Sequence, residues 1–172
     1  EAMAKGSLVE RLVIILEETG SGKSTILRRV AFDLAASGYV VLECTPLSRL
    51  DAQSTAEALD LIDEPLVVIV DDFAEQASSI SNVMAALEKK DVVFVCAERS
   101  YRERHILRSL GDIPRRIVSG LSLNQTEAFQ LVQSYVQRGM TASQTAIKFP
   151  ARFASDLVDE PIAVACCHIL ND

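Results

Sequence analysis

Residues 12–25 read L-V-I-I-L-E-E-T-G-S-G-K-S-T, and this stretch decides the fold. The apolar run at 12–16 is typical of a strand buried on both faces, and the residues from Lys23 onward have the pattern of a helix. Between them, Gly20 and Gly22 permit backbone conformations that turn successive N–H groups onto one concave face. The start of the helix adds the positive end of its dipole. We therefore expect this turn to bind an anion.

The Lys-Ser-Thr run at the helix start indicates that the anion is a nucleotide. Lys23 would reach the β- and γ-phosphates, Ser24 would ligate Mg²⁺, and Thr25 would donate toward the α-phosphate. Glu17 stands where such a loop usually has its first glycine, and we expect its carboxylate to weaken ATP binding by repulsion unless it faces solvent. A tight turn with incidental residues is the alternative, and the position after a buried strand argues against it. The predicted nucleotide-binding residues are Thr19, Gly20, Ser21, Gly22, Lys23, Ser24 and Thr25.

Four further apolar runs, at 39–42, 66–70, 92–95 and 116–118, alternate with helical patterns. Because these runs are continuous, they predict strands buried on both faces, as in a parallel sheet. Residues 24–36 have apolar positions at helical spacing and end at Ser37-Gly38, a C-cap pattern. Residues 80–90 have a second stripe, with Lys89 and Lys90 at the carbonyl end, where cations are favoured. This order of elements predicts an α/β fold.

From residue 122 onward the segments are helical and no further strand run occurs. Ser122-Leu-Asn-Gln125 has the form of a capping box, which predicts a helix through about Arg138. Further helices are expected at 149–157 and 161–170, with Pro161 in a first turn. We therefore predict a nucleotide-binding α/β domain at 1–120 and a small helical lid subdomain at 121–172.

Two aspartates, Asp71 and Asp72, follow the apolar strand at 66–70. A strand that ends this way can deliver a carboxylate to Mg²⁺ at the carboxyl edge of a sheet. We assign Asp71 to the metal, together with Ser24. Asp72 would orient or deprotonate a water near the γ-phosphate, with Glu75 as an alternative. Acidic residues also simply end strands, but a pair downstream of a phosphate loop favours a functional role.

The run V-V-F-V at 92–95 continues C-A-E-R-S, so Arg99 is expected at the same edge of the sheet. A planar cation there could sense the γ-phosphate and change its contacts when that phosphate leaves. Pairing with a neighbouring carboxylate is the other interpretation, and we favour the sensor. The simplest interpretation of the arginines that crowd this stretch is a solvated face: Arg99, Arg102, Arg104, Arg108, Arg115 and Arg116.

Composition limits the classes of partner. Of the 172 residues, 49% are hydrophobic and 24% are charged, which is typical of a globular protein. The net charge of −7 argues against broad binding to nucleic acid phosphates. No apolar run approaches the roughly 20 residues that span a bilayer. The four cysteines have no C-x-x-C spacing and indicate reduced thiols in a cytoplasmic protein. The opening E-A-M-A-K-G, without Met at position 1, indicates a piece of a longer protein.

The loop at 20–25, the D-D strand end, Arg99 and the helical tail resemble the nucleotide-binding core of the STAND class of P-loop NTPases. These proteins are relatives of the NACHT and NB-ARC modules and of AAA+ ATPases, and the first two motifs are of the Walker A and Walker B types. Residues 121–128, L-S-L-N-Q-T-E-A, are similar to the segment that opens the helical subdomain of these proteins. Residues 160–164 resemble their Gly-x-Pro motif, with Asp159 at the glycine position, so the resemblance assigns Pro161 to packing on the adenine.

The resemblance implies a five-stranded parallel sheet with an added strand between the P-loop strand and the acidic strand. It also implies that ATP or ADP with Mg²⁺ is held between the sheet edge and the helical lid. Slow hydrolysis would depend on Lys23, Asp72 and Arg99. In this class ADP holds a closed monomer, while ligand sensing and ATP favour an open form that oligomerises and activates a fused effector. The effector and the sensor would lie outside these residues, and many bacterial members with a D-D core serve in antiphage defence.

Three other functions use some of the same residues. A small-molecule kinase would share the loop and the magnesium site and could draw a basic lid from the arginines at 99–108. An AAA+-like loader or remodelling ATPase shares most motifs, but Asp72 stands where those proteins usually have glutamate. A structural scaffold without hydrolysis remains an alternative if Glu17 blocks the nucleotide. Turnover of ATP without an added acceptor would distinguish an ATPase from a kinase. Direct ATP titration would test the scaffold alternative.

Overall fold

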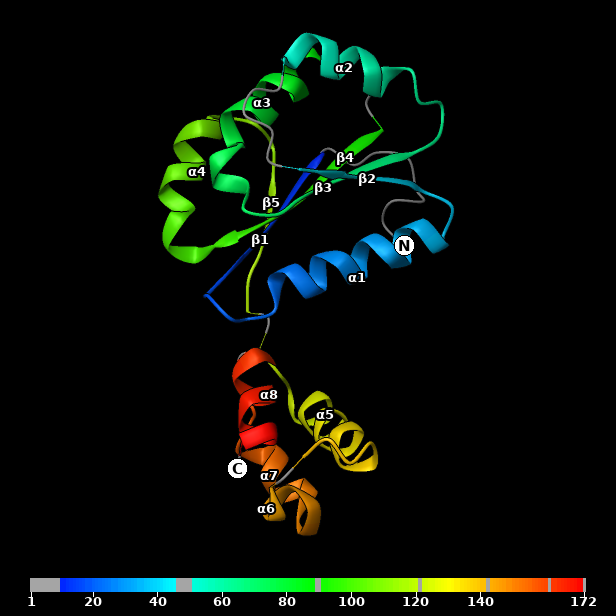
Figure 1. Ribbon diagram of the computed structural model, residues 1–172. Helices are drawn as coiled ribbons and strands as arrows, with labels where there is room; N and C mark the ends of the chain where they lie inside the picture. The colour runs from blue at the N-terminus through cyan, green and yellow to red at the C-terminus, as the bar shows by residue number, and fades with distance from the viewer. Residues whose placement is uncertain are drawn as a thin grey trace. The chain divides into compact units, whose positions relative to one another are not determined.

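The computed structural model describes residues 10–45, 51–88, 91–120, 122–141, 143–160 and 162–171 (Figure 1). The chain divides into two compact units, the first through Ser119 and the second from Gly120. The turn Thr19–Gly22 groups with the second unit. Of the helices in the described part of the chain, none is long and apolar enough to cross a membrane.

The first unit contains a five-stranded parallel sheet in the order β2-β3-β4-β1-β5. β4 lies between β1 and β3, which confirms the expected added strand between the loop-bearing strand and the acidic strand. It also brings the ends of all three strands to one edge of the sheet, because parallel strands point the same way. The strands are β1 (Leu12–Glu17), β2 (Val40–Cys44), β3 (Leu66–Val70), β4 (Val92–Arg99) and β5 (Arg116–Val118).

Burial differs between the centre of the sheet and its edges. All five residues of β3 are buried, as are the first seven of β4. The prediction of strands buried on both faces therefore holds for the centre, but it is wrong for the edge strands β2 and β5, which contain exposed residues such as Leu42 and Ile117. An edge strand has a neighbour on one side only, so its side chains are covered less completely.

Helices cover both faces of this sheet (Figure 1). α1 (Lys23–Ala36) lies on one face, and its predicted end is confirmed by Gly38, which has φ 92° and donates to the Ala35 carbonyl. α2 (Ala52–Asp60), α3 (Ala77–Ala86) and α4 (Glu103–Leu110) cover the other face. α3 ends before the predicted Lys89 and Lys90, which lie outside the described residues. α2 and α4 are helices that the apolar pattern did not predict.

The main core lies between the sheet and α2, α3 and α4. Phe94 of β4 is 1% exposed, and it packs with Val68, Ile80 and Ile106. Truncating a buried Phe to Ala typically costs about 3–5 kcal/mol, so this layer fixes the central strands firmly. The rigid centre is what holds the carboxyl ends of β3 and β4 in place.

The second unit is helical and has a small core of its own. Its helices are α5 (Gln125–Gln137), α6 (Gln144–Lys148), α7 (Pro150–Ser155) and α8 (Ile162–Asn171). A capping box opens α5, but its members are Asn124 and Glu127 and not Ser122 and Gln125. Asn124 is as good an N-cap as serine, so the pattern was displaced by two residues. The core residues include Ala128, Val132, Phe153, Leu157, Ala165 and Ile169.

Candidate functional site

The predicted phosphate loop follows β1 directly and ends where α1 begins. Gly20 and Gly22 have φ angles of 84° and 85°. These values lie in the left-handed region, which costs an ordinary residue roughly 1–2 kcal/mol and glycine nothing. Ser21, between them, is only 1% exposed. The glycines are therefore required by the turn that the chain makes here.

α1 begins at Lys23, so Lys23, Ser24 and Thr25 form its first turn. The backbone N–H groups of a first turn have no partner within the helix and are available to an anion. Lys23 Nζ donates to the carbonyl oxygen of Glu18 at 2.6 Å, so its side chain reaches back across the loop. An ammonium group in this place is positioned beside any phosphate that the loop amides bind.

Glu17 does not lie in the loop. It is the last residue of β1, pairs in register with Arg99 of β4 and is half-buried. The position that usually has the first glycine of a phosphate loop is thus still strand here, and the turn begins after it. This place in the sheet explains how the chain accommodates glutamate at that position.

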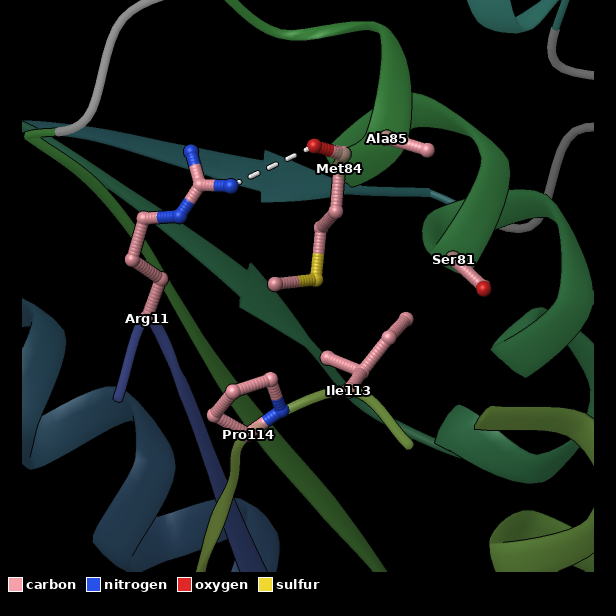
Figure 2. Close-up of a pocket in the computed structure, with 6 residues that line it drawn as sticks. All are labelled: Arg11, Ser81, Met84, Ala85, Ile113 and Pro114. Atoms are coloured by element: carbon pink, nitrogen blue, oxygen red, sulfur yellow. Dashed lines mark hydrogen bonds between the residues drawn. The ribbon is translucent and has the colours of Figure 1, made fainter. Parts of the chain in front are cut away.

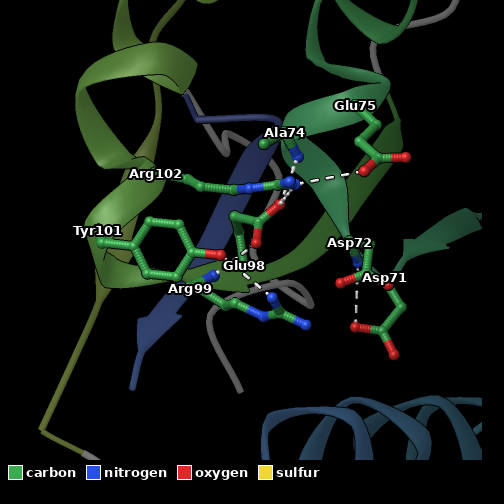
Figure 3. Close-up of polar contacts among 8 residues, drawn as sticks. All are labelled: Asp71, Asp72, Ala74, Glu75, Glu98, Arg99, Tyr101 and Arg102. Carbon is green, nitrogen blue, oxygen red and sulfur yellow. Dashed lines mark hydrogen bonds and ion pairs between the residues drawn. The ribbon is translucent and has the colours of Figure 1, made fainter. Parts of the chain in front are cut away.

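The acidic turn, which we define as residues 71–76, follows β3. Asp71 is half-buried, and its Oδ1 accepts a hydrogen bond from the Asp72 N–H at 3.1 Å (Figure 3). Asp72 is exposed and has φ 49° and ψ 50°, a left-handed conformation that aspartate tolerates better than most residues. A short 3₁₀ helix, η2 (Phe73–Glu75), completes the turn, and Gln76 accepts a hydrogen bond from Cys44 Sγ of β2 at 3.0 Å.

Ser24 and Asp71 line the same pocket, which has a volume of about 280 Å³ between α1 and strands β2 and β3. A hydroxyl and a carboxylate are hard oxygen donors of the kind that Mg²⁺ binds, usually with phosphate oxygens and water as its other ligands. Among the described residues there is no group of three His, Cys, Asp or Glu side chains that could hold a metal ion. Ser24 and Asp71 supply two oxygen donors, which fits an Mg²⁺ whose other ligands are phosphate oxygens and water.

Arg99 ends β4 at the same edge of the sheet. Its Nη1 donates to the Tyr101 hydroxyl at 3.1 Å (Figure 3). This hydrogen bond and the charges of Tyr101, Asp72 and Glu98 raise the pKa of Arg99 above its ordinary value. The same bond lowers the pKa of Tyr101. Arg99 thus places a cation, oriented by the Tyr101 hydroxyl, at the edge of the sheet where the acidic turn also begins.

Glu98 is a site residue that the sequence did not reveal. It is 1% exposed, and its two carboxylate oxygens accept hydrogen bonds from backbone N–H groups on different segments (Figure 3). Oε2 accepts from Ala74 in the acidic turn, and Oε1 accepts from Arg99, both at 2.7 Å. A glutamate within an otherwise apolar strand, V-V-F-V-C-A-E-R, was the available signal, because a charged residue there needs a partner.

Arg102 places a cation beside the buried carboxylate of Glu98. Its Nη1 lies 3.6 Å from Glu98 Oε2 and 3.5 Å from Glu75 Oε1, and its side chain is 32% exposed. The charge of Glu98 is the main reason that the pKa of Arg102 is raised. The interpretation of the arginine-rich stretch as a solvated face is therefore wrong for Arg102, which is partly covered because it neutralises a buried charge.

A second pocket lies at the other end of β1, away from the loop (Figure 2). It has a volume of about 340 Å³, and Arg11 at its wall donates to the Met84 carbonyl near the end of α3 at 3.4 Å. None of the predicted site residues lines it. Pro161, the residue assigned to the adenine, lies outside the described residues.

Comparison with known proteins gives a family and a fold. A family model described as Novel STAND NTPase 5 matches residues 4–110, which is more than half of the chain. No curated protein matches the sequence.

Two solved structures resemble the whole chain. The RuvB Holliday junction branch migration motor of Thermotoga maritima has a TM-score of 0.55 at 13% identity, covering 98% of this chain and 63% of that one. A DNA replication initiation factor has a TM-score of 0.58 at 12% identity, covering 97% of this chain and 55% of that one. The chain thus spans less than two thirds of either structure. Identities this low show a shared fold alone.

Proposed function

The chain belongs to the novel STAND NTPase 5 family, and on this premise we propose that it is the ATP-binding and ATP-hydrolysing core of a molecular switch. Residues 1–120 are the nucleotide-binding domain, and residues 121–172 serve as the lid. The observation that carries the proposal is the left-handed pair Gly20 and Gly22 between a buried strand and the first turn of α1. Such a turn presents backbone N–H groups and a helix N-terminus to phosphate.

Each residue of the loop has a proposed part in binding. The amides of residues 19–25 enclose the phosphates, Lys23 contacts the β- and γ-phosphates, and Thr25 donates toward the α-phosphate. Lys23 would exchange the Glu18 carbonyl for phosphate oxygens, a stronger charge-assisted contact. Pro161 is proposed to pack on the adenine.

Ser24 and Asp71 would hold Mg²⁺, since both line one pocket with oxygen donors. When bound, the metal ion neutralises charge on the phosphate oxygens. Asp72 is proposed to orient a water for attack on the γ-phosphate. Arg99, anchored on Tyr101 and interacting electrostatically with Asp72, is proposed to contact the γ-phosphate and to report its loss.

The switch is proposed to work through the γ-phosphate. A nucleotide can shift an equilibrium between two arrangements only if it binds them with different affinity, and loss of the γ-phosphate changes that difference. ADP would favour a closed monomer, and ATP an open form that forms homo-oligomers and activates an effector. Sensor and effector would be other parts of the protein or its partners. Antiphage defence in the cytoplasm is the biological role that this behaviour fits.

Two measurements test the enzymatic part. Calorimetric titration with ATP and Mg²⁺ should show one site, and purified protein should release phosphate slowly without any added acceptor. Release of phosphate only in the presence of a small-molecule acceptor would instead indicate a kinase. The absence of any ATP binding would contradict the proposal and leave a structural scaffold.

The switch itself is tested by light scattering after size-exclusion chromatography. With ADP the protein should elute as a monomer, and with a non-hydrolysable ATP analogue its mass should rise to a multiple of 18.8 kDa. An identical mass with both nucleotides would contradict the proposal that the nucleotide controls assembly in this part of the protein. The proposal that the protein binds ATP would still stand.

A further inference from the structure

Glu98 connects two parts of the candidate site that follow different strands of the sheet. Ala74 belongs to the acidic turn after β3, and Arg99 ends β4. The carboxylate of Glu98 accepts from the N–H groups of both, at 2.7 Å each. The Glu98 carboxylate therefore ties the backbone of the acidic turn to the end of β4.

The acidic turn needs such support. Asp72 is in a left-handed conformation, which is strained for a residue with a side chain, and strain of this kind persists only where the surroundings hold it. The Asp71 carboxylate holds the turn from within, at the Asp72 N–H. Glu98 holds it from β4, which is the central strand of the sheet and is buried over seven of its eight residues.

Keeping Glu98 charged in this place requires compensation. Its side chain is fully buried, and a buried carboxylate is tolerated only with hydrogen bonds and a counter-charge. The two N–H groups supply the hydrogen bonds, and Arg102 supplies the cation at 3.6 Å. Arg102 lies equally close to Glu75, the last residue of η2, so the cation also contacts the acidic turn itself.

We propose that Glu98 is a positioning residue that joins the Asp72 turn to Arg99, so that the water-orienting carboxylate and the γ-phosphate sensor keep one mutual geometry. This inference rests on the proposed function, because it assigns Glu98 a part in the same hydrolytic site. Glu98 has no contact with the nucleotide in this proposal. It acts on hydrolysis through Asp72 and leaves binding by the loop unchanged.

The first test is the hydrogen exchange of the Ala74 and Arg99 amides in nucleotide-free protein, followed by NMR. Glu98→Gln keeps the shape of the side chain, but its amide nitrogen would face an N–H donor, so one of the two bonds is lost. The amide that faces this nitrogen, Ala74 or Arg99, should then exchange at least about tenfold faster than in the wild type. Glu103→Gln, an exposed glutamate at the start of α4, is the matched control and should change the rate by less than about twofold. Unchanged exchange rates at both the Ala74 and the Arg99 amides in E98Q overturn the inference.

The second test is a double-mutant cycle on ATP hydrolysis. E98Q should slow hydrolysis roughly ten- to a hundredfold and leave ATP affinity within about twofold. If Glu98 acts through Asp72, then D72N/E98Q should be within about twofold of D72N alone. Effects that multiply would mean that Glu98 acts only on general stability, and would overturn the inference.

Arg102→Met is the second variant, and it tests the inference about Glu98 if E98Q does not fold. It removes the cation and keeps the apolar stem and both N–H bonds. Exchange at Ala74 should be about two- to tenfold faster, and D72N/R102M should again hydrolyse ATP as D72N does. Failure of the proposed hydrolytic function and failure of the inference about Glu98 can be told apart. Wild-type protein that cleaves no ATP ends the hydrolytic proposal and the catalytic half of this inference, whereas normal hydrolysis by E98Q ends the inference alone.

Discussion

The phosphate loop and the acidic turn follow β1 and β3, and they hold their backbones by different means. In the loop, Gly20 and Gly22 take left-handed conformations that cost glycine nothing. In the acidic turn, Asp72 takes a similar conformation with a side chain attached. That turn is then held by groups from two other strands, Glu98 of β4 and Cys44 of β2.

The contrast shows which backbone shapes can be explained by local sequence alone. A loop built from its own glycines is determined by the six or seven residues that form it. A turn built on long-range hydrogen bonds depends on residues that lie about 30 positions away in the chain, so its sequence alone does not explain its shape. The comparison also predicts different responses to substitution, from large to small.

The largest effect is expected at Lys23. Lys23→Ala should weaken ATP binding by roughly a thousandfold, because contacts of a cation to two phosphates are lost and each is worth about 1.5–3 kcal/mol. Calorimetric titration measures the affinity of each variant for ATP. Arg29→Ala, which removes an exposed cation from the same helix, is the control and should leave the affinity unchanged. An unaltered affinity in K23A would show that the loop is not the phosphate site.

Asp72 should affect the rate and not the affinity. Asp72→Asn is expected to bind ATP normally and to cleave it roughly a hundredfold more slowly, because it loses the group that orients or deprotonates the water. Phosphate release at saturating ATP measures this. Asp112→Asn, an exposed aspartate beyond α4, controls for the loss of charge. Normal hydrolysis by D72N would move the role to another residue, with Glu75 the next to test.

A reciprocal pair of substitutions sharpens the backbone contrast. Gly22→Ala should lower the free energy of unfolding by about 1–2 kcal/mol, because alanine is strained at φ 85°. Asp72→Gly should change it by less than about 1 kcal/mol, since relief of the left-handed conformation offsets the greater freedom of the unfolded chain. Urea unfolding measures both. Equal effects in the two variants would remove the distinction between loop and turn.

The smallest effect is expected at Glu17. Because this residue ends β1 and lies before the loop, Glu17→Gln should raise ATP affinity by less than about fivefold, which is within the 0–1 kcal/mol of a single partly exposed charge. Glu10→Gln, which makes the same change of charge at the other end of the strand, is the control. A gain in affinity well above fivefold in E17Q alone would mean that the carboxylate does face the phosphates.

The sheet could be predicted largely from the sequence. The apolar runs located all five strands, and the strand-turn-helix order located the loop, because buried strands and glycine turns are determined by neighbouring residues. α2 and α4 were missed, and α4 is a short helix in which only Ile106 and Leu110 are buried. The capping box at Asn124 was displaced by two residues because serine and asparagine both cap helices well.

The residues of the candidate site also fall into two groups, those that the sequence indicated and those that it did not. Lys23, Ser24, Asp71 and Arg99 were predicted from their positions after strands or at a helix start. Glu98 and Arg102 were not, because their importance comes from tertiary contacts with residues 72–76. Sequence spacing shows which residues reach an edge of a sheet, and it does not show which of them hold the others in place.

The parallel pairing of β4 with both β1 and β3 limits how this chain can vary in length. Side chains alternate between the two faces of a strand, so deleting one residue between 92 and 97 would reverse the faces of Glu98 and Arg99 relative to the core. The carboxylate would be directed away from the Ala74 amide, while the guanidinium would replace it among apolar groups. Homologous chains and engineered variants should therefore accept insertions in the loops around β4 far more readily than within it.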